Sequence, residues 1–218
     1  MRYLSYAFAE TLRRQERKGA RWVPSAKSPQ SGATNEEPDA VKEIPDHSHE
    51  ANGVLTQEVS DVDRLTQIRR HLGDCQRCAL AGGRTHLVFG EGSSTADVMI
   101  VGEAPGRDED LQGVPFVGAA GQLLTKMIKA MGLERDEVYI CNILKCRPPD
   151  NRNPEPEEVE ACEPFLLKQI DAIHPHFIVA MGNFAAKTLL RTSTGITRLR
   201  GQFHSYHGIP VMPTFHPA

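Results

Sequence analysis

Residues 98–106 read VMIVGEAPG, a short apolar run that stops at a glycine and passes into a polar turn. Such a run is typical of a strand that is buried on both faces of a sheet. The pattern recurs at 138–143 (VYICNI) and 177–181 (FIVAM), and helical periodicity fills the gaps at 118–131 and 156–173. This alternation predicts a three-layer α/β fold: a mostly parallel central sheet with helices on both faces.

Further elements extend the predicted domain in both directions, and the globular part is expected to cover residues 60–218. Residues 1–59 are expected to form a disordered extension, because a basic start followed by proline and polar residues buries too little apolar surface. The basic start is interpreted as a solvated tail or as an arm that tracks DNA. The additional elements are helices at 61–72 and 183–190 and short strands at 87–89, 202–206 and 210–215.

The 218-residue chain carries 25 Lys and Arg against 28 Asp and Glu, a formal charge of −3. This balance argues against nucleic-acid binding through overall charge, so phosphate contacts must come from a local patch. Neither a bilayer-spanning apolar run nor a secretory signal is recognisable, and we predict a cytoplasmic protein without membrane contact. We also expect a monomer. Because stable disulfides are rare in that compartment, the five cysteines indicate metal binding, redox chemistry or core packing.

Four cysteines form a pattern that suggests metal binding: Cys75 and Cys78 make a C-x-x-C pair, and Cys146 and Cys162 follow much later. Thiolates in this arrangement suit zinc or a [4Fe–4S] cluster. Zinc sites usually contain two close pairs, and only one pair is close here, which favours the cluster. A redox-active C-x-x-C is disfavoured because no strand precedes it. Cys141 lies within an apolar strand and is predicted to be a core residue.

Polar residues follow the ends of the predicted strands, where ligands bind in parallel sheets. Gly102 and Glu103 begin the turn after the first buried strand, Asn142 lies near the end of the second, and His216 follows the last strand. Phe116 precedes a predicted helix and is interpreted either as a core residue or as a stacking platform for a planar ring. We therefore expect an enzyme site at this edge of the sheet.

The amide of Asn142 offers a donor and an acceptor side by side, which match the O4 and N3–H edge of uracil. Cytosine presents the reverse pattern and would leave both groups unpaired. His216 can donate a hydrogen bond to charge that develops on a leaving group; a histidine without such a role is the alternative. Basic side chains near this edge are interpreted as a phosphate-binding patch or as solvated charges: Lys145, Arg147, Arg152, Arg198 and Arg200.

Five motifs in this order carry a family resemblance: C-x-x-C, GEAPGRDED, GVPFVG, ICNILKCRPPDNRNP and TFHPA. From about Leu65 to Ala218 the chain resembles the family 4 uracil-DNA glycosylases, iron–sulfur enzymes of bacteria and archaea. The resemblance implies the uracil-DNA glycosylase fold and activity on uracil-containing DNA, single- or double-stranded. It implies a [4Fe–4S] cluster on Cys75, Cys78, Cys146 and Cys162. The implied uracil-binding residues are Gly102, Glu103, Ala104, Phe116, Asn142 and His216.

The implied reaction is hydrolysis of the N-glycosidic bond of a deoxyuridine that has left the base stack. The same resemblance implies that Phe116 stacks on uracil. It implies three catalytic residues: Asn142 holds the base edge, His216 donates a hydrogen bond to O2, and Glu103 is the third. Glu103 is expected to orient water or to balance the cationic sugar. The classical single-subunit enzymes place an Asp near this turn, where this chain has Ala104 beside Glu103. The missing Asp favours electrostatic stabilisation of the leaving uracil over general-base catalysis.

The sequence also departs from related patterns. Gly106 stands where the classical enzymes have a bulky Tyr that excludes thymine. A sister group bonds covalently to uracil through a His in a basic loop, and residues 145–153 (KCRPPDNRN) contain no His, which favours turnover. The family continues past HPA with a loop and a helix, so we expect the C-terminal end of the domain to be missing. Two alternatives are a non-catalytic iron–sulfur or zinc module that binds nucleic acid, and a redox protein using the C-x-x-C pair.

Overall fold

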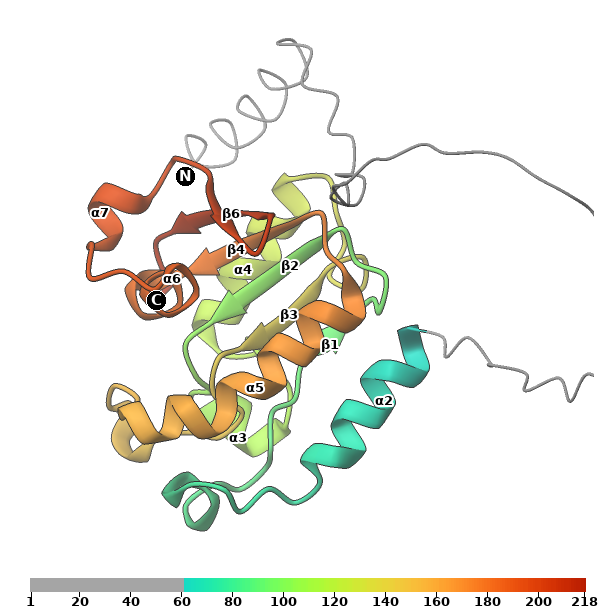
Figure 1. Cartoon of the computed structure of the whole chain (residues 1–218), viewed down its shortest axis with the longest axis vertical. Coiled ribbons are helices and arrows are strands. Elements are labelled where there is room, and N and C mark those ends of the chain that lie inside the picture. The colour runs from blue at the N-terminus through green and yellow to red at the C-terminus, as the bar shows by residue number, and fades with distance from the viewer. Residues whose placement is uncertain (1–60) are drawn as a thin grey trace, which may run out of the picture.

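A computed structural model describes residues 61–218 (Figure 1). Residues 1–60, and with them the extension predicted at 1–59, lie outside the described residues. One six-stranded sheet, in the order β1-β3-β2-β4-β6-β5, forms the centre of the molecule. Helices lie against both faces of this sheet (Figure 1), so the predicted three-layer α/β fold is confirmed.

The sheet is parallel in its interior and antiparallel at its edges. Strands β3, β2, β4 and β6 run parallel, whereas β1 pairs antiparallel with β3 and β5 pairs antiparallel with β6. The four inner strands are mostly buried and mostly apolar, as expected for parallel strands covered on both faces. The strands are β1 (Glu91–Gly92), β2 (Val98–Gly102), β3 (Tyr139–Asn142), β4 (Phe177–Met181), β5 (His204–Tyr206) and β6 (Ile209–Thr214).

The described residues also form six helices and two 3₁₀ turns. Within residues 61–218, no helix has the length and apolar character that a membrane span requires. The helices are α2 (Asp61–Leu72), α3 (Arg107–Gln112), α4 (Ala119–Ala130), α5 (Pro156–Ile173), α6 (Gly182–Leu190) and α7 (Ile196–Leu199), and the 3₁₀ turns are η1 (Ala79–Gly82) and η2 (Pro149–Asn151).

Side-chain alternation along the strands determines which helix covers which face. In β2, Met99 and Val101 belong to the larger core, to which α5 and α6 contribute. Val98 and Ile100 belong to the smaller core on the other face, to which α4 contributes. Helix α2 packs on α5 from outside (Figure 1). The two cores together hold the strand ends rigidly in place.

The parallel register brings the carboxyl ends of the inner strands to one edge of the sheet. Gly102 of β2 is the partner of Asn142 in β3, and Met181 of β4 is the partner of Thr214 in β6. Two further backbone hydrogen bonds, each 3.0 Å long, carry the pairing of β2 and β3 beyond the strand ends. The loops that leave this edge therefore start from closely spaced and well-anchored positions.

The strand predicted at 87–89 is wrong, because the chain joins the sheet only at β1. Val88 is buried and its N–H donates to the carbonyl of Lys145 at 2.8 Å, but no ladder follows. Gly90 and Gly92, with φ of 145° and 120°, then turn the chain onto β3. A side chain at Gly92 would overlap the carbonyl of Val138, so only glycine allows this pairing.

Helix α3 is an element that sequence patterning did not predict, because its acidic residues were interpreted as part of a turn. Gly106 is its extended N-cap, and Asp108, Glu109 and Asp110 occupy its first turn. Carboxylates at this end complement the helix dipole and stabilise the helix. Helix α7 is also absent from the prediction, since four residues carry too little periodicity to be recognised.

Candidate active site and cysteine site

Four predicted site residues come together at the carboxyl edge of the sheet: Gly102, Phe116, Asn142 and His216. A Cβ atom at Gly102 would lie 2.6 Å from Cζ of Phe116 and would overlap Oδ1 of Asn142. The rings of Phe116 and His216 have centroids 5.7 Å apart and planes tilted by 32°. Residues from β2, β3, the loop before α4 and the segment after β6 therefore share one space, which we call the sheet-edge site.

Asn142 is a buried polar residue whose side chain the surrounding protein does not fully satisfy. The residue is 2% exposed, and within residues 61–218 its Oδ1 has no hydrogen-bond partner. A buried acceptor without a partner costs about 1–3 kcal/mol. The sheet-edge site thus presents an acceptor that a bound donor would satisfy.

Phe116 is both a core residue and a wall of the sheet-edge site. It is buried in the smaller core, while its ring also faces Gly102 and His216. Its φ of 52° lies in the left-handed region, which is unusual for a bulky residue and costs about 1–3 kcal/mol. Gly121 makes room for this conformation, since a side chain there would overlap the carbonyl of Phe116.

Glu109 fixes the loop that carries Phe116, and sequence reasoning missed it. Its Oε1 accepts hydrogen bonds from the N–H groups of Val117 at 2.9 Å and Gly118 at 3.0 Å, and its Oε2 accepts from Gly106 at 3.1 Å. One carboxylate therefore joins the turn after β2 to the loop before α4. The available signal was the position of Glu109 as third residue of a helix, where a carboxylate reaches back to the N-terminus.

The backbone near His216 determines which ring nitrogen carries the proton. The N–H of Ala218 donates to Nδ1 at 3.2 Å, which leaves Nε2 as the donor of the neutral ring. Surrounding protein atoms lower the pKa of His216, and the carboxylate of Glu109 opposes this effect. Gly182, at φ 92°, gives the side chain room, since a Cβ there would lie 3.2 Å from Cβ of His216.

Glu103 and Ala104 continue the turn after Gly102, but their side chains differ in what they can contribute. Glu103 is half-buried, and this burial raises the pKa of its carboxyl group. The methyl group of Ala104 packs against the larger core. At the sheet edge, Ala104 can therefore contribute only its backbone.

The predicted basic patch is wrong at Lys145, which is fully buried because the chain after β3 turns inward against α5. Other members of the patch are paired within the protein. Arg152 forms an ion pair with Glu158, with 2.6 Å between Nη2 and Oε1, and Arg200 lies 4.4 Å above the ring of Phe215. The local positive charge available to phosphate is thus smaller than the sequence indicates.

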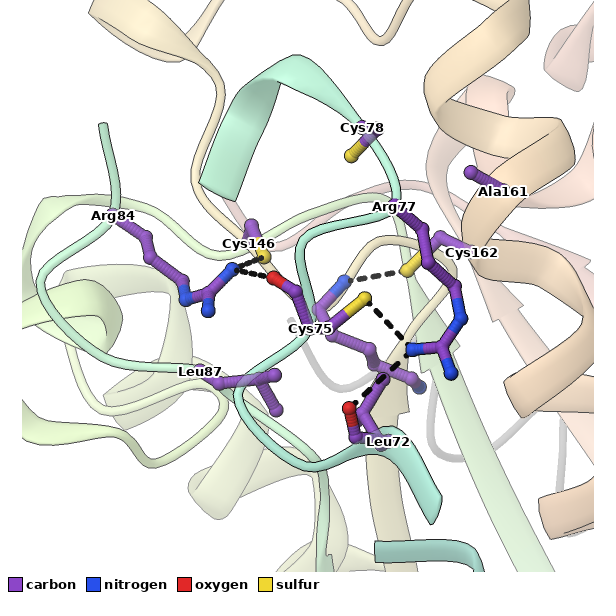
Figure 2. Close-up of a pocket in the computed structure, with 10 residues that line it drawn as sticks. Leu72, Cys75, Arg77, Cys78, Arg84, Leu87, Cys146, Ala161 and Cys162 are labelled. Atoms are coloured by element: carbon purple, nitrogen blue, oxygen red, sulfur yellow. Dashed lines mark hydrogen bonds between the residues drawn. The ribbon is translucent and has the colours of Figure 1, made fainter. Parts of the chain in front are cut away.

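A second site lies between the chain next to η1, the loop after β3 and α5 (Figure 2). Its four cysteines, all free thiols, line one hollow, and we call this the cysteine site. Within residues 61–218, no three Cys, His, Asp or Glu side chains converge on a single metal-ion position. The cysteines of the site are Cys75, Cys78, Cys146 and Cys162.

Hydrogen-bond donors face three of the four sulfur atoms (Figure 2). Such donors stabilise thiolates and tune a bound metal group. Sequence reasoning singled out the cysteines but not these partners, which come from three different segments. The hydrogen bonds run from Arg77 Nη1 to Cys75 Sγ at 3.2 Å, from Arg84 Nη1 to Cys146 Sγ at 3.4 Å, and from Lys145 N–H to Cys162 Sγ at 3.2 Å.

Burial disfavours the charged thiolates that these hydrogen-bond donors stabilise. It raises the pKa of Cys146, although Arg84 partly offsets this, and it raises the pKa of Cys162 to about 11. Both free thiols are therefore protonated near neutral pH, and metal binding must displace their protons. Cys141 is wholly buried in the larger core, as predicted.

Comparison with known proteins assigns a family to this fold. The family model of the uracil DNA glycosylase superfamily matches residues 89–218, and these residues contain the whole sheet and the sheet-edge site. The type-4 uracil-DNA glycosylase of Archaeoglobus fulgidus is 46% identical over 165 residues, which cover 72% of this chain and 83% of that protein. The type-4 uracil-DNA glycosylase of Sulfurisphaera tokodaii is 47% identical over 166 residues, which cover 72% of this chain and 76% of that protein.

The fold and the matched residues define the class as the uracil-DNA glycosylase superfamily. A type-5 uracil-DNA glycosylase of Pyrobaculum aerophilum is 33% identical over 144 residues, or 58% of this chain and 63% of that protein. Identity to the type-4 proteins is higher and extends over more of the chain, and the chain belongs to the type-4 uracil-DNA glycosylases. The resemblance carried by the five sequence motifs is thereby confirmed.

Proposed function

We propose that this protein hydrolyses the N-glycosidic bond of deoxyuridine in DNA, releasing uracil and leaving an abasic site. The unpartnered Oδ1 of Asn142 carries the proposal, because a buried acceptor beside an aromatic ring suits the N3–H of a pyrimidine. The names of the related type-4 uracil-DNA glycosylases support the same reaction. It belongs to DNA repair, since uracil in DNA is a damaged base.

Recognition begins when the target nucleotide leaves the base stack. Phe116 provides an aromatic face on which the flat base can stack. Oδ1 of Asn142 accepts from N3–H, and its amide nitrogen donates to O4. Cytosine has an acceptor at N3 and a donor at N4, so it would leave the buried amide unpaired and lose binding energy. Gly102 keeps the backbone close enough for this contact.

Cleavage breaks the C1′–N1 bond, and its electron pair stays on the departing uracil. The neutral ring of His216 donates from Nε2 to O2, where negative charge develops, while Nδ1 is held by Ala218 N–H. The half-buried Glu103 balances the cationic sugar or orients the water that adds to C1′ and gives up a proton. Stabilisation of the uracil anion, rather than a strong general base, supplies most of the rate.

We further propose that the cysteine site holds a [4Fe–4S] cluster. Each of the four thiolates would bind one iron, and the donors from Arg77, Arg84 and Lys145 N–H would stabilise the sulfur charge. When bound, the cluster would cross-link the chain before β1 to the β3 exit and α5.

The substrate is DNA that contains uracil, in single- or double-stranded form. A monomer is sufficient, because residues of a single chain form both the sheet-edge site and the cysteine site. Unpaired DNA avoids the cost of breaking a base pair, so single strands should be processed at least as fast as duplexes.

The test is uracil release from end-labelled oligonucleotides that carry one uracil, either single-stranded or opposite A or G. Alkali-labile breaks at uracil, and none in matched oligonucleotides with cytosine or thymine, are the expected result. Iron and sulfide should co-purify with a brown colour. DNA binding without base release by iron-loaded protein would overturn the proposal in favour of a non-catalytic binding module, and stoichiometric zinc would overturn the cluster assignment.

A further inference from the structure

Lys145 connects the sheet-edge site to the cysteine site. The residue is 0% exposed, the lowest value of any charged residue within 64–218. Its backbone N–H donates to Sγ of Cys162 at 3.2 Å, and its Nζ donates to the carbonyl oxygen of Asn142 at 2.6 Å. One residue therefore contacts both a candidate cluster ligand and the residue that presents the base-reading amide.

The other contacts of Lys145 Nζ are neutral. Gln169 Oε1 accepts from Nζ at 2.7 Å, and Gln169 Nε2 in turn donates to Tyr139 Oη at 2.9 Å and to the Phe89 carbonyl at 3.0 Å. Burial raises the pKa of Tyr139, so the phenol stays uncharged. Within residues 61–218, no carboxylate forms an ion pair with Lys145.

A buried ammonium without a counter-charge costs several kcal/mol. The nearby source of negative charge is the cysteine site, because Lys145 lines the same hollow as the four cysteines and its backbone N–H donates to Sγ of Cys162. Four iron-bound thiolates carry a net negative charge as a group. The loaded site would therefore supply the counter-charge that the described protein groups around Nζ do not.

We propose that Lys145 is a positioning residue that links the cysteine site to base reading. Its ammonium is the counter-charge of the loaded cluster, and the same ammonium holds the Asn142 carbonyl and thereby the end of β3. This inference rests on the proposed function. It predicts that removing the charge changes both the reduction potential of the cluster and kcat for uracil release, although Lys145 touches neither the uracil nor the sugar.

Lys145→Met tests this in the iron-loaded protein, because methionine keeps most of the side-chain volume and removes the charge. We expect the reduction potential of the cluster to become more negative, since a nearby positive charge favours the reduced form. We expect kcat for uracil release to fall by about tenfold or more, with a smaller change in KM. Lys126→Met, which removes an exposed lysine on α4, is the matched control and should change neither quantity.

Gln169→Glu provides a second variant if Lys145→Met does not fold. It leaves Lys145 in place and puts a carboxylate beside Nζ, so it should also shift the potential to a more negative value. A wild-type potential in either variant would overturn the link to the cysteine site, and wild-type kcat in Lys145→Met would overturn the link to base reading. If wild-type protein released no uracil, the proposed function would fail, while the potential would still decide the role of the charge.

Discussion

The sheet-edge site and the cysteine site are built in different ways. At the sheet edge, backbone register and close packing place the functional groups: Gly102 and Asn142 are register partners, and Phe116 is buried in the smaller core. At the cysteine site, four side chains from three segments meet around a hollow, and long charged side chains surround them. The first site is formed by the fold itself, whereas the second would be completed by the proposed cluster.

The two sites therefore differ in what binding a ligand would cost. The sheet-edge site contains an unpaired amide oxygen and a strained φ, which the two cores compensate, so it is preorganised for a ligand. The cysteine site contains buried thiols whose pKa values are raised, so the proposed cluster would have to supply the free energy that deprotonates them. Variants at the two sites should therefore separate activity from stability.

The largest effect is expected for Cys146→Ser, which removes a buried thiol that we propose as a cluster ligand. The variant should lose most of its iron and more than about 3 kcal/mol of unfolding free energy, because metal binding contributes to folding. Iron analysis and denaturant unfolding measure both effects. Cys141→Ala is the matched control, because Cys141 is a core residue in the same region. It should keep the iron and lose only about 1–2 kcal/mol. Iron loss in both variants would remove the distinction between ligand and core cysteine.

Asn142→Ala should lower kcat for uracil release by about 10²–10³-fold, as does removal of one preorganised hydrogen-bonding group in other enzymes. Its unfolding free energy should be unchanged or higher, because the change removes an unpaired buried oxygen. Asn183→Ala is the control: Asn183 Oδ1 accepts from the N–H of Ile196, so this variant should lose stability and keep activity. A stability loss in Asn142→Ala would contradict preorganisation of the sheet-edge site.

Gly102→Ala tests whether the sheet-edge site needs the close approach of the β2 backbone. The added methyl would collide with Oδ1 of Asn142 and with the ring of Phe116, so uracil release should fall by about tenfold or more while iron content stays at the wild-type level. Gly195→Ala places a methyl where no atom lies within 4 Å and should retain wild-type kcat. Full activity of Gly102→Ala would show that the close approach of β2 is not needed.

Glu109→Gln has the smallest expected effect, because it keeps the shape of the side chain. The carboxylate raises the pKa of His216, so its removal should lower that pKa further, and the ring should become protonated only at a lower pH. NMR titration of His216 measures this shift, and kcat should fall only a few-fold because some hydrogen bonds to the Phe116 loop persist. Asp108→Asn, one residue earlier on α3, should leave the His216 titration unchanged. An unshifted pKa in Glu109→Gln would remove the electrostatic role.

Much of the architecture was predictable from local patterns. The apolar runs at β2, β3 and β4 and the long periodic helix α5 lie within one or two residues of the predicted ranges. The strand predicted at 87–89 failed because glycine torsions, rather than apolar character, decide where the chain meets β3. Helix α3 was missed because its acidic residues look like a polar turn until the N-cap geometry is known.

At the candidate sites, too, some residues were predictable from local sequence patterns and others were not. Asn142, Phe116, His216 and the cysteines were recognisable as chemical groups at strand ends or in a C-x-x-C pattern. Glu109 and Lys145 were not, because their roles depend on partners from other elements. Lys145 was even predicted to be exposed among arginines, whereas the fold turns it into the interior.

The alternation of strands and helices, the family, and the kinds of chemical group at the two sites are readable from the amino-acid order alone. Periodicity and motif order are local properties of the chain, so they can be recognised without coordinates. Three features required the folded arrangement: Oδ1 of Asn142 is left without a partner among the described residues, one carboxylate joins two loops, and a buried ammonium contacts the end of β3. The physical reason is that burial and hydrogen-bond partnership arise from packing between residues far apart in the chain.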